Sequence, residues 1–455
     1  MTSHLTTDPA QTLRERLGDL VVLPDDAEYD QARMPWNTAV DQRPAAVARP
    51  ESAEDVVQIV RAAVDAGLRI APQSTGHGAA ALADTDLSDC VLVSLVGLRG
   101  VTVDVGTRSA RVLGGSVWDD VLAAAAPHGL TALHGSSGGV SVAGYALSGG
   151  LSFYVREKGL AVNSVRAVQV VTADGSLVRA SADENPDLFW AVRGGAGSFG
   201  VVVSLEIDLM PLADVYAGML LWDASRAAEV VPAYAAWTTT APESATTTLR
   251  VMHFPPIPDL PPFLSGRDLV VIDGAILESD AAATDLLAPL RALDPEMDTF
   301  ARIPSAGLVA VHMDPPDPTP ALTAHAMLGS LPDEAVAAFL EASALPGVFF
   351  LELRHLGGAA TRPAEGGGAV SALDGEFLLH AVALAPVPEA LAPAGAVVQA
   401  AVASFAPWQV DALALTFIDG GGVDPAQGYG ASLDRLRELK LRFDPEGRFA
   451  AARAV

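Results

Sequence analysis

Short apolar and polar stretches alternate along residues 42–210, and their spacing predicts strands and helices in turn. The stretch "SAEDVVQIVRAAVDAG" has apolar residues at helical spacing, begins at a serine suited to cap a helix, and ends at Gly67. "SVWDDVLAAAAPHG" and "ENPDLFWAVRG" also favour helices. The runs "AAVARP", "CVLVSL" and "GVVVSLEIDLMPL" are typical of strands, and "VDVGTRSARV" and "VVTADGSLV" are typical of hairpins. We therefore expect an α+β domain here.

Residues 213–408 have a different pattern of apolar and polar residues. Strand-like runs alternate with alanine-rich stretches typical of helices and with loops rich in proline and glycine. The runs are "TTTLRVMHF", "DLVVIDGAIL", "LVAVHMD", "VFFLELRHL" and "FLLHAVAL". This pattern predicts a second domain, built on one antiparallel sheet with helices on one face.

Length, composition and charge exclude several classes of protein. With 455 residues the chain is too long for one ordinary core, which favours two domains. Its net charge of −27 would repel a phosphate backbone, so we expect no nucleic-acid partner. The longest apolar region is broken by a charged residue and prolines, so we expect no membrane span of about 20 apolar residues.

Cysteine usage and the N-terminal stretch narrow the picture further. The single cysteine, Cys90, excludes an internal disulfide and any multi-cysteine metal site, and we expect no metal. The stretch "MTSHLTTDPAQTLRERLGDL" lacks the apolar core of a secretion signal. We therefore expect a cytoplasmic protein.

The stretch "GAGSFG" matches the glycine pattern of dinucleotide-binding Rossmann domains. That motif works only after a strand and before a helix, because the helix N-terminus receives the pyrophosphate. Here a predicted helix comes before the glycines and a predicted strand comes after them. We therefore reject the Rossmann interpretation and expect a helix-to-strand turn that approaches a neighbour closely.

Two other segments combine small residues with few solubilising side chains. "HGSSGGVSVAGYALSGGLSFYVREKGL", residues 134–160, favours a buried segment whose backbone NH groups face an anionic ligand. "PQSTGHGA", residues 72–79, has the composition of a turn but carries His77. This second segment is either an ordinary loop or a backbone against which a ligand lies, with His77 in contact.

Together with the C-terminal "YGASLDRLRELKLRFDPEGRF", these segments resemble the FAD-linked oxidases of the vanillyl-alcohol oxidase/p-cresol methylhydroxylase (PCMH) superfamily. They look most like its berberine-bridge-enzyme-like and 6-hydroxy-D-nicotine oxidase-like members. The resemblance implies an α+β, two-domain PCMH-type FAD-binding fold. It implies an FAD-binding domain in residues 1–212 with its core at 42–212, a substrate domain in 213–408 and a C-terminal return to the FAD domain in 409–455.

The resemblance also implies where FAD would lie. His77 stands where many members carry the flavin covalently through its 8α-methyl carbon. The second attachment point of bicovalent members falls on Ser137, whose hydroxyl ionises far less readily than a thiol, so only one covalent bond is implied. The expected cofactor-binding residues are His77, Gln73, Ser74, Thr75, Gly76, Gly78, Ser136, Ser137, Gly138, Gly139, Val140, Ser141, Gly144, Gly149, Gly200 and Val201.

Candidate catalytic residues come from one predicted strand and from the flavin segments. In "VFFLELRHL", Glu352 and Arg354 share one face of the strand, so they either pair with each other or line a cavity. His380 lies in the next strand-like run, and the resemblance places Tyr145 and Tyr429 near the flavin. The candidates are therefore Glu352, Tyr429, Tyr145, His380 and Arg354, and a purely structural Glu–Arg pair stays open.

The resemblance implies a reaction class but no substrate. Its members transfer a hydride from a carbon next to oxygen or nitrogen to FAD, and dioxygen commonly reoxidises the flavin. In plant members the residue three positions after the attachment cysteine controls access of dioxygen, and counting from Ser137 gives Val140. We expect a small-molecule substrate: an alcohol, amine, sugar or phenolic compound. Two alternatives are an FAD-dependent tailoring enzyme that cyclises or oxygenates, and a non-catalytic flavin-binding protein.

Overall fold

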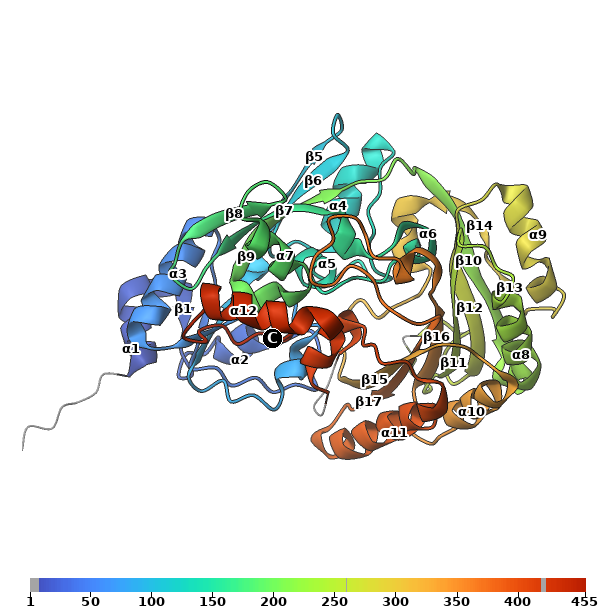
Figure 1. The fold of residues 1–455 in the computed structure, drawn as a ribbon. Helices are drawn as coiled ribbons and strands as arrows, with labels where there is room; N and C mark the ends of the chain where they lie inside the picture. The colour runs from blue at the N-terminus through green and yellow to red at the C-terminus, as the bar shows by residue number, and fades with distance from the viewer. Residues whose placement is uncertain (1–7, 259, 419–422) are drawn as a thin grey trace, which may run out of the picture.

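The computed structural model describes residues 8–258, 260–418 and 423–455, which form three sheets with helices around them (Figure 1). Two sheets come from the first half of the chain and the third from the middle. The first has four strands in the order β1 (Val21–Val22), β2 (Ala46–Ala48), β4 (Cys90–Ser94) and β3 (Arg69–Gln73). The second has five antiparallel strands in the order β5 (Val101–Asp104), β6 (Ser109–Leu113), β9 (Val201–Asp208), β7 (Val165–Val171) and β8 (Leu177–Ser181).

The helix α3 (Ala53–Ala66) forms as its sequence predicts and connects β2 to β3, and both of these strands pair in parallel with β4. Ser52 and Asp55 form a reciprocal capping box at its start, and Gly67 ends it in the left-handed conformation at φ 78°. Its apolar face packs on the strands of this sheet. The other helices of this half are α1 (Pro9–Leu17), α2 (Tyr29–Arg33), α4 (Trp118–Ala125), α5 (Val142–Ala146), α6 (Val155–Lys158) and α7 (Pro186–Gly195).

The third sheet is antiparallel, and helices cover one of its faces (Figure 1). These helices are α8 (Ala227–Thr238), α9 (Asp280–Arg291), α10 (Asp333–Ser343) and α11 (Leu391–Ala403). The strands run in the order β13 (Met297–Asp298), β10 (Asp214–Asp223), β12 (Asp268–Ile276), β11 (Ala245–His253), β16 (Phe350–His355), β17 (Phe377–Leu384) and β15 (Ala321–Leu328), and β14 (Ala301–Pro304) also pairs with β10. We call the opposite face, which carries no such helices, the front face.

The predicted α+β architecture with one large antiparallel sheet is confirmed, but one predicted strand is wrong. Residues 308–314 form no strand: a 3-10 helix covers Ser305–Ala310, and the chain then crosses the front face. Leu308 is buried there against β10 and β12, and His312 bonds to Asp273 of β12. A segment with alternating apolar residues can therefore lie across the face of a sheet, and it need not form a strand within one. The strand β15, which the sequence analysis did not find, completes the edge instead.

The C-terminal segment returns to the first half of the chain. The helix α12 (Leu433–Phe443) packs Leu436 and Leu439 into the core of the five-stranded sheet. Phe449 then lies beside Ile70 of β3, where the backbone NH of Ala450 donates to the carbonyl oxygen of Ile70 at 2.9 Å. The passage between the two sheet systems falls between β9 and β10, while the exact domain limits at residues 212 and 408 stay a prediction.

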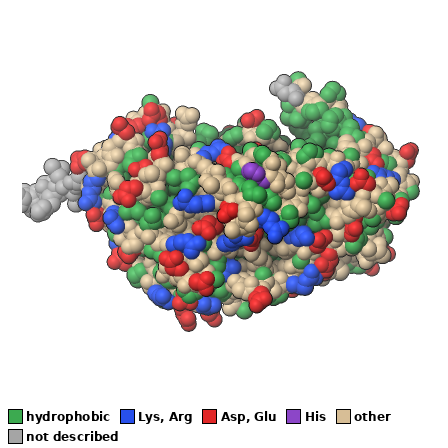
Figure 2. All heavy atoms as spheres, turned by 90° about the horizontal axis from the view of Figure 1, so that it is seen from above, with side chains coloured by type: hydrophobic (Ala, Val, Ile, Leu, Met, Phe, Trp, Pro, Cys, Tyr) green, Lys and Arg blue, Asp and Glu red, His purple; other side chains and the backbone are tan. Residues whose placement is uncertain are grey.

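On the face shown in Figure 2, acidic and basic side chains are interspersed, so the net charge of −27 is not gathered into one patch there. Among the described residues, no helix combines the length and the apolar character that crossing a membrane requires.

Candidate active site

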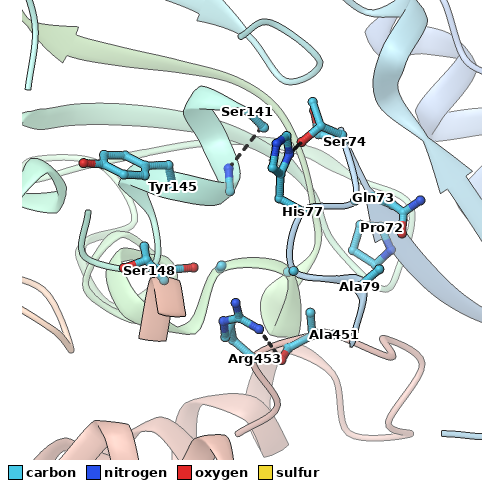
Figure 3. Close-up of a pocket in the computed structure, with 18 of the residues that line it drawn as sticks. Pro72, Gln73, Ser74, His77, Ala79, Ser141, Tyr145, Ser148, Ala451 and Arg453 are labelled. Atoms are coloured by element: carbon cyan, nitrogen blue, oxygen red, sulfur yellow. Dashed lines mark hydrogen bonds between the residues drawn. The ribbon is translucent and has the colours of Figure 1, made fainter. Parts of the chain in front are cut away.

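A cavity lies where the loop after β3 meets the start of α5, the turn after α7 and the C-terminal segment (Figure 3). It contains about 880 Å³ of empty space, including its open mouth. Segments from both ends of the chain therefore build one site. The lining residues are Pro72, Gln73, Ser74, Thr75, Gly76, His77, Gly78, Ala79, Leu82, Val140, Ser141, Gly144, Tyr145, Ser148, Ala196, Gly197, Thr416, Ala451, Ala452 and Arg453.

The loop after β3 fixes the ring of His77 at the cavity wall. Gly76 has φ 78°, and a Cβ there would come within 2.6 Å of the Cβ of Pro35, so the turn requires glycine. The His77 ring stacks on Trp36 with centroids 4.3 Å apart, and its Nδ1 lies 2.8 Å from the Thr75 hydroxyl. Its Nε2 is buried and has no hydrogen-bond partner among the described residues. Burial lowers the pKa of His77 to about 4, against the opposing effect of Asp314, so the imidazole is neutral at neutral pH.

The glycine-rich segment contributes part of what the sequence predicted. Val140, Ser141 and Gly144 line the cavity, and the Ser141 hydroxyl accepts a hydrogen bond from the Gly144 NH at the start of α5. The other expected residues of this segment do not line it: Ser136, Ser137, Gly138, Gly139 and Gly149. Gly138 packs against the Asp119 carboxylate of α4, and the Ser136 hydroxyl donates to Asp314 at 2.7 Å.

Two further expected cofactor residues lie outside the cavity lining. Gly200 packs on β7, where a Cβ would come within 2.5 Å of the carbonyl oxygen of Val171. Val201 is buried in the core of the first sheet. The helix-to-strand turn therefore approaches a strand closely, and its earlier residues Ala196 and Gly197 reach the cavity. Sequence order alone could not say which end of this turn faces the ligand.

The C-terminal segment supplies lining residues that the sequence analysis missed. Arg453 is buried, and its guanidinium Nη2 would lie 2.9 Å from a Cβ placed on Gly78. Figure 3 shows Arg453 and His77 entering the cavity from different segments. Thr416 also lines the cavity. The pairing of Phe449 with Ile70 brings Arg453 to this place, and that contact joins residues too distant in the chain for a local pattern to reveal it.

A group of buried charged side chains lies on the front face of the large sheet. We call Arg250, Asp273, His312, Glu352, Arg354 and His380 the front-face cluster. Asp273 accepts from Arg250 at 2.5 Å and from the Thr248 hydroxyl at 2.7 Å, and His312 Nδ1 lies 3.1 Å from both carboxylate oxygens. Burial would raise the pKa of Asp273, but His312 and Arg250 outweigh it and hold the pKa below its usual value. Both oxygens of Asp273 are thus fully used within the protein.

Glu352 differs from Asp273 in one respect. Arg354 Nε donates to its Oε1 at 2.8 Å. Its Oε2 has no hydrogen-bond partner in the part of the chain that the structure describes, and it lies 3.5 Å from His380 Nδ1. Burial would raise its pKa, yet Arg354 and the two histidines hold the pKa well below the usual value. The cluster therefore presents an ionised carboxylate with one oxygen available.

The front-face cluster adjoins the cavity through two segments. The Arg354 guanidinium lies 5.1 Å from the ring centroid of Phe417, which follows the lining residue Thr416. Burial raises the pKa of the cavity-lining Tyr145, while the charge of Arg354 acts in the opposite direction. The Nε2 of His325 accepts from the NH of Ala414 at 3.2 Å and so holds this part of the chain in place. The structure thus brings Glu352, Arg354, His380 and Tyr145 to one side of one site.

Tyr429 does not join them. Its ring is buried in the core of the five-stranded sheet, and its hydroxyl donates to the carbonyl oxygen of Arg453 at 2.9 Å. Burial raises its pKa. The resemblance placed its segment near the flavin, but the direction of the side chain depends on how the C-terminal return packs.

We expect Tyr429→Phe to leave turnover unchanged. The variant loses a hydrogen bond to the backbone, which should lower the free energy of unfolding by about 1 kcal/mol. Steady-state kinetics and urea unfolding of the same preparations would check both parts. A large loss of turnover at unchanged stability would contradict this placement and return Tyr429 to the catalytic residues.

Comparison with known proteins agrees with this geometry. Residues 44–181 match an FAD binding domain. Over 203 residues the chain is 37% identical to (R)-6-hydroxynicotine oxidase of Paenarthrobacter nicotinovorans, which covers 44% of each protein. The first part of the chain therefore carries an FAD binding domain. The chain spans less than half the length of the curated relatives that it matches.

Solved structures show the same fold across nearly the whole chain. Physcomitrella patens BBE-like 1 superposes with a TM-score of 0.83 at 20% identity and covers 99% of both chains. Glucooligosaccharide oxidase from Acremonium strictum, described as carrying 6-S-cysteinyl, 8α-N1-histidyl FAD, gives a TM-score of 0.81 at 21% identity over 98% of this chain and 99% of its own. The two-domain fold with an FAD domain and a large antiparallel-sheet domain is therefore confirmed.

The matched domain makes FAD the cofactor of this protein, and the cavity suits it. Several lining side chains hold buried polar atoms that have no hydrogen-bond partner within the described residues: Ser74 Oγ, His77 Nε2, Tyr145 Oη and Thr416 Oγ1. Gly76 and Gly78 leave backbone bare beside them, so a large polar ligand can lie against the loop. Within residues 8–258, 260–418 and 423–455, no group of three His, Cys, Asp or Glu side chains could hold a metal ion.

Proposed function

We propose that this protein oxidises a small organic alcohol or amine by hydride transfer to FAD, with dioxygen as the final electron acceptor. The observation that carries the proposal is an FAD-type cavity adjoined by an ionised carboxylate, Glu352, whose Oε2 has no hydrogen-bond partner among the described residues and lies beside His380. Bound FAD supplies the hydride acceptor. Arg354 keeps Glu352 ionised, and Glu352 with His380 accepts the proton of the substrate O–H or N–H.

An anaerobic screen tests this proposal. Candidate alcohols, amines and sugars are mixed with the FAD-loaded protein, and loss of the oxidised flavin absorbance is recorded. Substrate oxidation removes two electrons, so air admitted afterwards should restore the absorbance and form one hydrogen peroxide per flavin. If dithionite reduced the bound flavin and no candidate substrate did, the protein would be a flavin carrier, and the proposed oxidation would be wrong.

We further propose that FAD is attached covalently through a ring nitrogen of His77 and through no other residue. A neutral imidazole with an unpartnered nitrogen in the cavity wall supports the first part. The second part rests on Ser137, whose hydroxyl is a weaker nucleophile than the thiol of a bicovalent relative. Mass spectrometry of the flavin-bearing peptides tests it: a peptide around Ser137 that carries flavin would contradict a single bond.

Dioxygen as the acceptor gives a prediction at Val140, which lines the cavity. In a close-packed interior, one extra methylene can fill the space that dioxygen needs beside the flavin. We expect Val140→Leu to slow reoxidation of the reduced protein by about tenfold or more, and Val140→Ala to leave it fast. Stopped-flow mixing with oxygenated buffer measures both rates. Sluggish reoxidation of the unmodified protein would instead indicate a dehydrogenase with another acceptor.

A further inference from the structure

We propose that the substrate has an apolar, aromatic body and a single hydrogen-bond-donating alcohol or amine, and that it is not an oligosaccharide. This inference rests on the proposed oxidation at the same site. It comes from a line of rings on the front face, which we call the aromatic row: Phe417, His380, Phe350, Phe349 and Phe254.

The aromatic row leads away from the cavity in short steps. Phe417 follows the cavity-lining Thr416, and its ring centroid lies 5.1 Å from that of His380. The next steps, from His380 to Phe350 and on to Phe349, are 5.8 and 5.6 Å. Every ring of the row is partly exposed, in contrast to the buried apolar side chains on the covered face of the sheet. The exposed parts of these rings can therefore contact an apolar ligand.

The surroundings of the outer rings are apolar. Phe254 and Phe350 pack against a cluster of buried residues on the same side of the sheet. Its buried members are Met219, Leu221, Met252, Leu264, Leu269 and Val271. A sugar bound here would bury several hydroxyl groups without partners, at a cost of roughly 1–3 kcal/mol for each by mutational measures. An aromatic body meets no such cost and gains contact with the rings.

The polar end of the site offers few free atoms: in the front-face cluster, Glu352 Oε2, His380 Nδ1 and Arg250 Nε have no hydrogen-bond partner among the described residues, and Glu352 Oε2 is the one carboxylate oxygen of the three. Within the front-face cluster, Arg250 and Asp273 bind each other, and Arg354 donates to Glu352 Oε1. Glu352 Oε2 and His380 Nδ1 stay without a hydrogen-bond partner among the described residues and lie 3.5 Å apart. One O–H or N–H donor of the substrate can bond to Glu352 Oε2. The site thus matches a molecule with one polar group at the reacting carbon.

Two matched panels test the proposal on the FAD-loaded protein under anaerobic conditions. One holds benzyl alcohol, 4-hydroxybenzyl alcohol, benzylamine and 1-phenylethylamine, and the other holds xylobiose and cellobiose. We expect flavin reduction by at least one aromatic compound, with a second-order rate constant at least tenfold above that of either sugar. Reduction by the sugars alone would overturn this inference and leave the proposed oxidation standing. Reduction by neither panel, in a protein that dithionite still reduces, would count against both.

Variants in the aromatic row give a readout independent of turnover. Phenol is titrated into the oxidised protein, and its binding is followed through the change in the flavin spectrum. We expect Phe350→Ala to raise the dissociation constant of phenol by about tenfold, and Phe350→Leu, which keeps the volume but loses the ring, to raise it less. Phe443→Ala is the control, because Phe443 is partly buried at the end of α12, remote from the front face. Equal affinity in the Phe350 variants and the unmodified protein would overturn the proposal.

Discussion

Replacing His77 with alanine is expected to abolish the covalent attachment of FAD and to lower turnover at least tenfold. In the unmodified protein the imidazole is neutral, held between Trp36 and Thr75, with Nε2 unpartnered in the cavity wall. A neutral ring nitrogen keeps the lone pair that would form the bond to the 8α carbon. In that step a C–H bond of the 8α-methyl group would break with loss of a proton, and its two electrons would reduce the flavin, which the proposed acceptor dioxygen would reoxidise. In the alanine variant, which lacks the imidazole, FAD is held only by the remaining lining residues. Acid precipitation reports the change directly: the yellow colour should move from the pellet to the supernatant.

His134 offers a matched control for this experiment. It is also buried with an unpartnered Nε2, and burial lowers its pKa to about 4, but it lies outside the cavity lining. We expect His134→Gln to cost stability and to keep the flavin in the pellet. If acid precipitation released all the flavin from the unmodified protein, the proposed covalent attachment would be wrong, regardless of the results for the two variants.

The second large effect is expected at Glu352. We expect Glu352→Gln to lower turnover by about 10² with flavin content intact, because the amide keeps the shape of the side chain but cannot accept a proton. The low pKa of Glu352 makes it a weak base, so we place its effect at the lower end of the range for acid–base catalysis. Presteady-state reduction of the flavin by substrate measures the chemical step itself.

Asp273→Asn is the matched control for Glu352. Asp273 is an equally buried carboxylate of the front-face cluster, but both its oxygens already accept hydrogen bonds from the protein. We expect its loss to lower the free energy of unfolding by about 3–5 kcal/mol, because Arg250 would be left as an unpaired buried charge, and to change flavin reduction much less. If Glu352→Gln reduced the flavin at the normal rate, the Glu352–Arg354 pair would be structural.

The pH dependence follows from the direction of the same shift. A carboxylate whose pKa lies well below its usual value stays ionised across the neutral range. The contribution of Glu352 to turnover should therefore be constant near neutrality and be lost only as the pH falls through its lowered pKa. The charge on Glu352 also stabilises the fold above its usual pKa, and that contribution disappears in the same acidic range.

The sequence predicted those parts of the site that local patterns encode. Glycines and small residues around His77 indicated a loop built for a ligand, and the alternation in "VFFLELRHL" placed Glu352 and Arg354 on one face. Arg453 and Thr416 escaped notice because long-range packing of the C-terminal segment brings them to the cavity. The stretch 308–314 was predicted as a strand because its alternation also suits a segment that lies across a sheet. The periodicity of apolar residues indicates which side chains are buried, but it does not indicate which element of the structure they pack against.

The cavity wall contains segments from both ends of the chain, and this affects when FAD can bind during synthesis of the protein. Its wall needs residues 72–79 near the start of the chain and residues 451–453 near its end, while the large sheet between them uses residues 214–384. A ribosome releases the chain from the N-terminus onward, so the large sheet can form while the cavity wall still lacks its last segment. We therefore expect cofactor loading to follow translation, and a nascent chain halted before residue 449 to retain FAD poorly even when its first two sheets have folded.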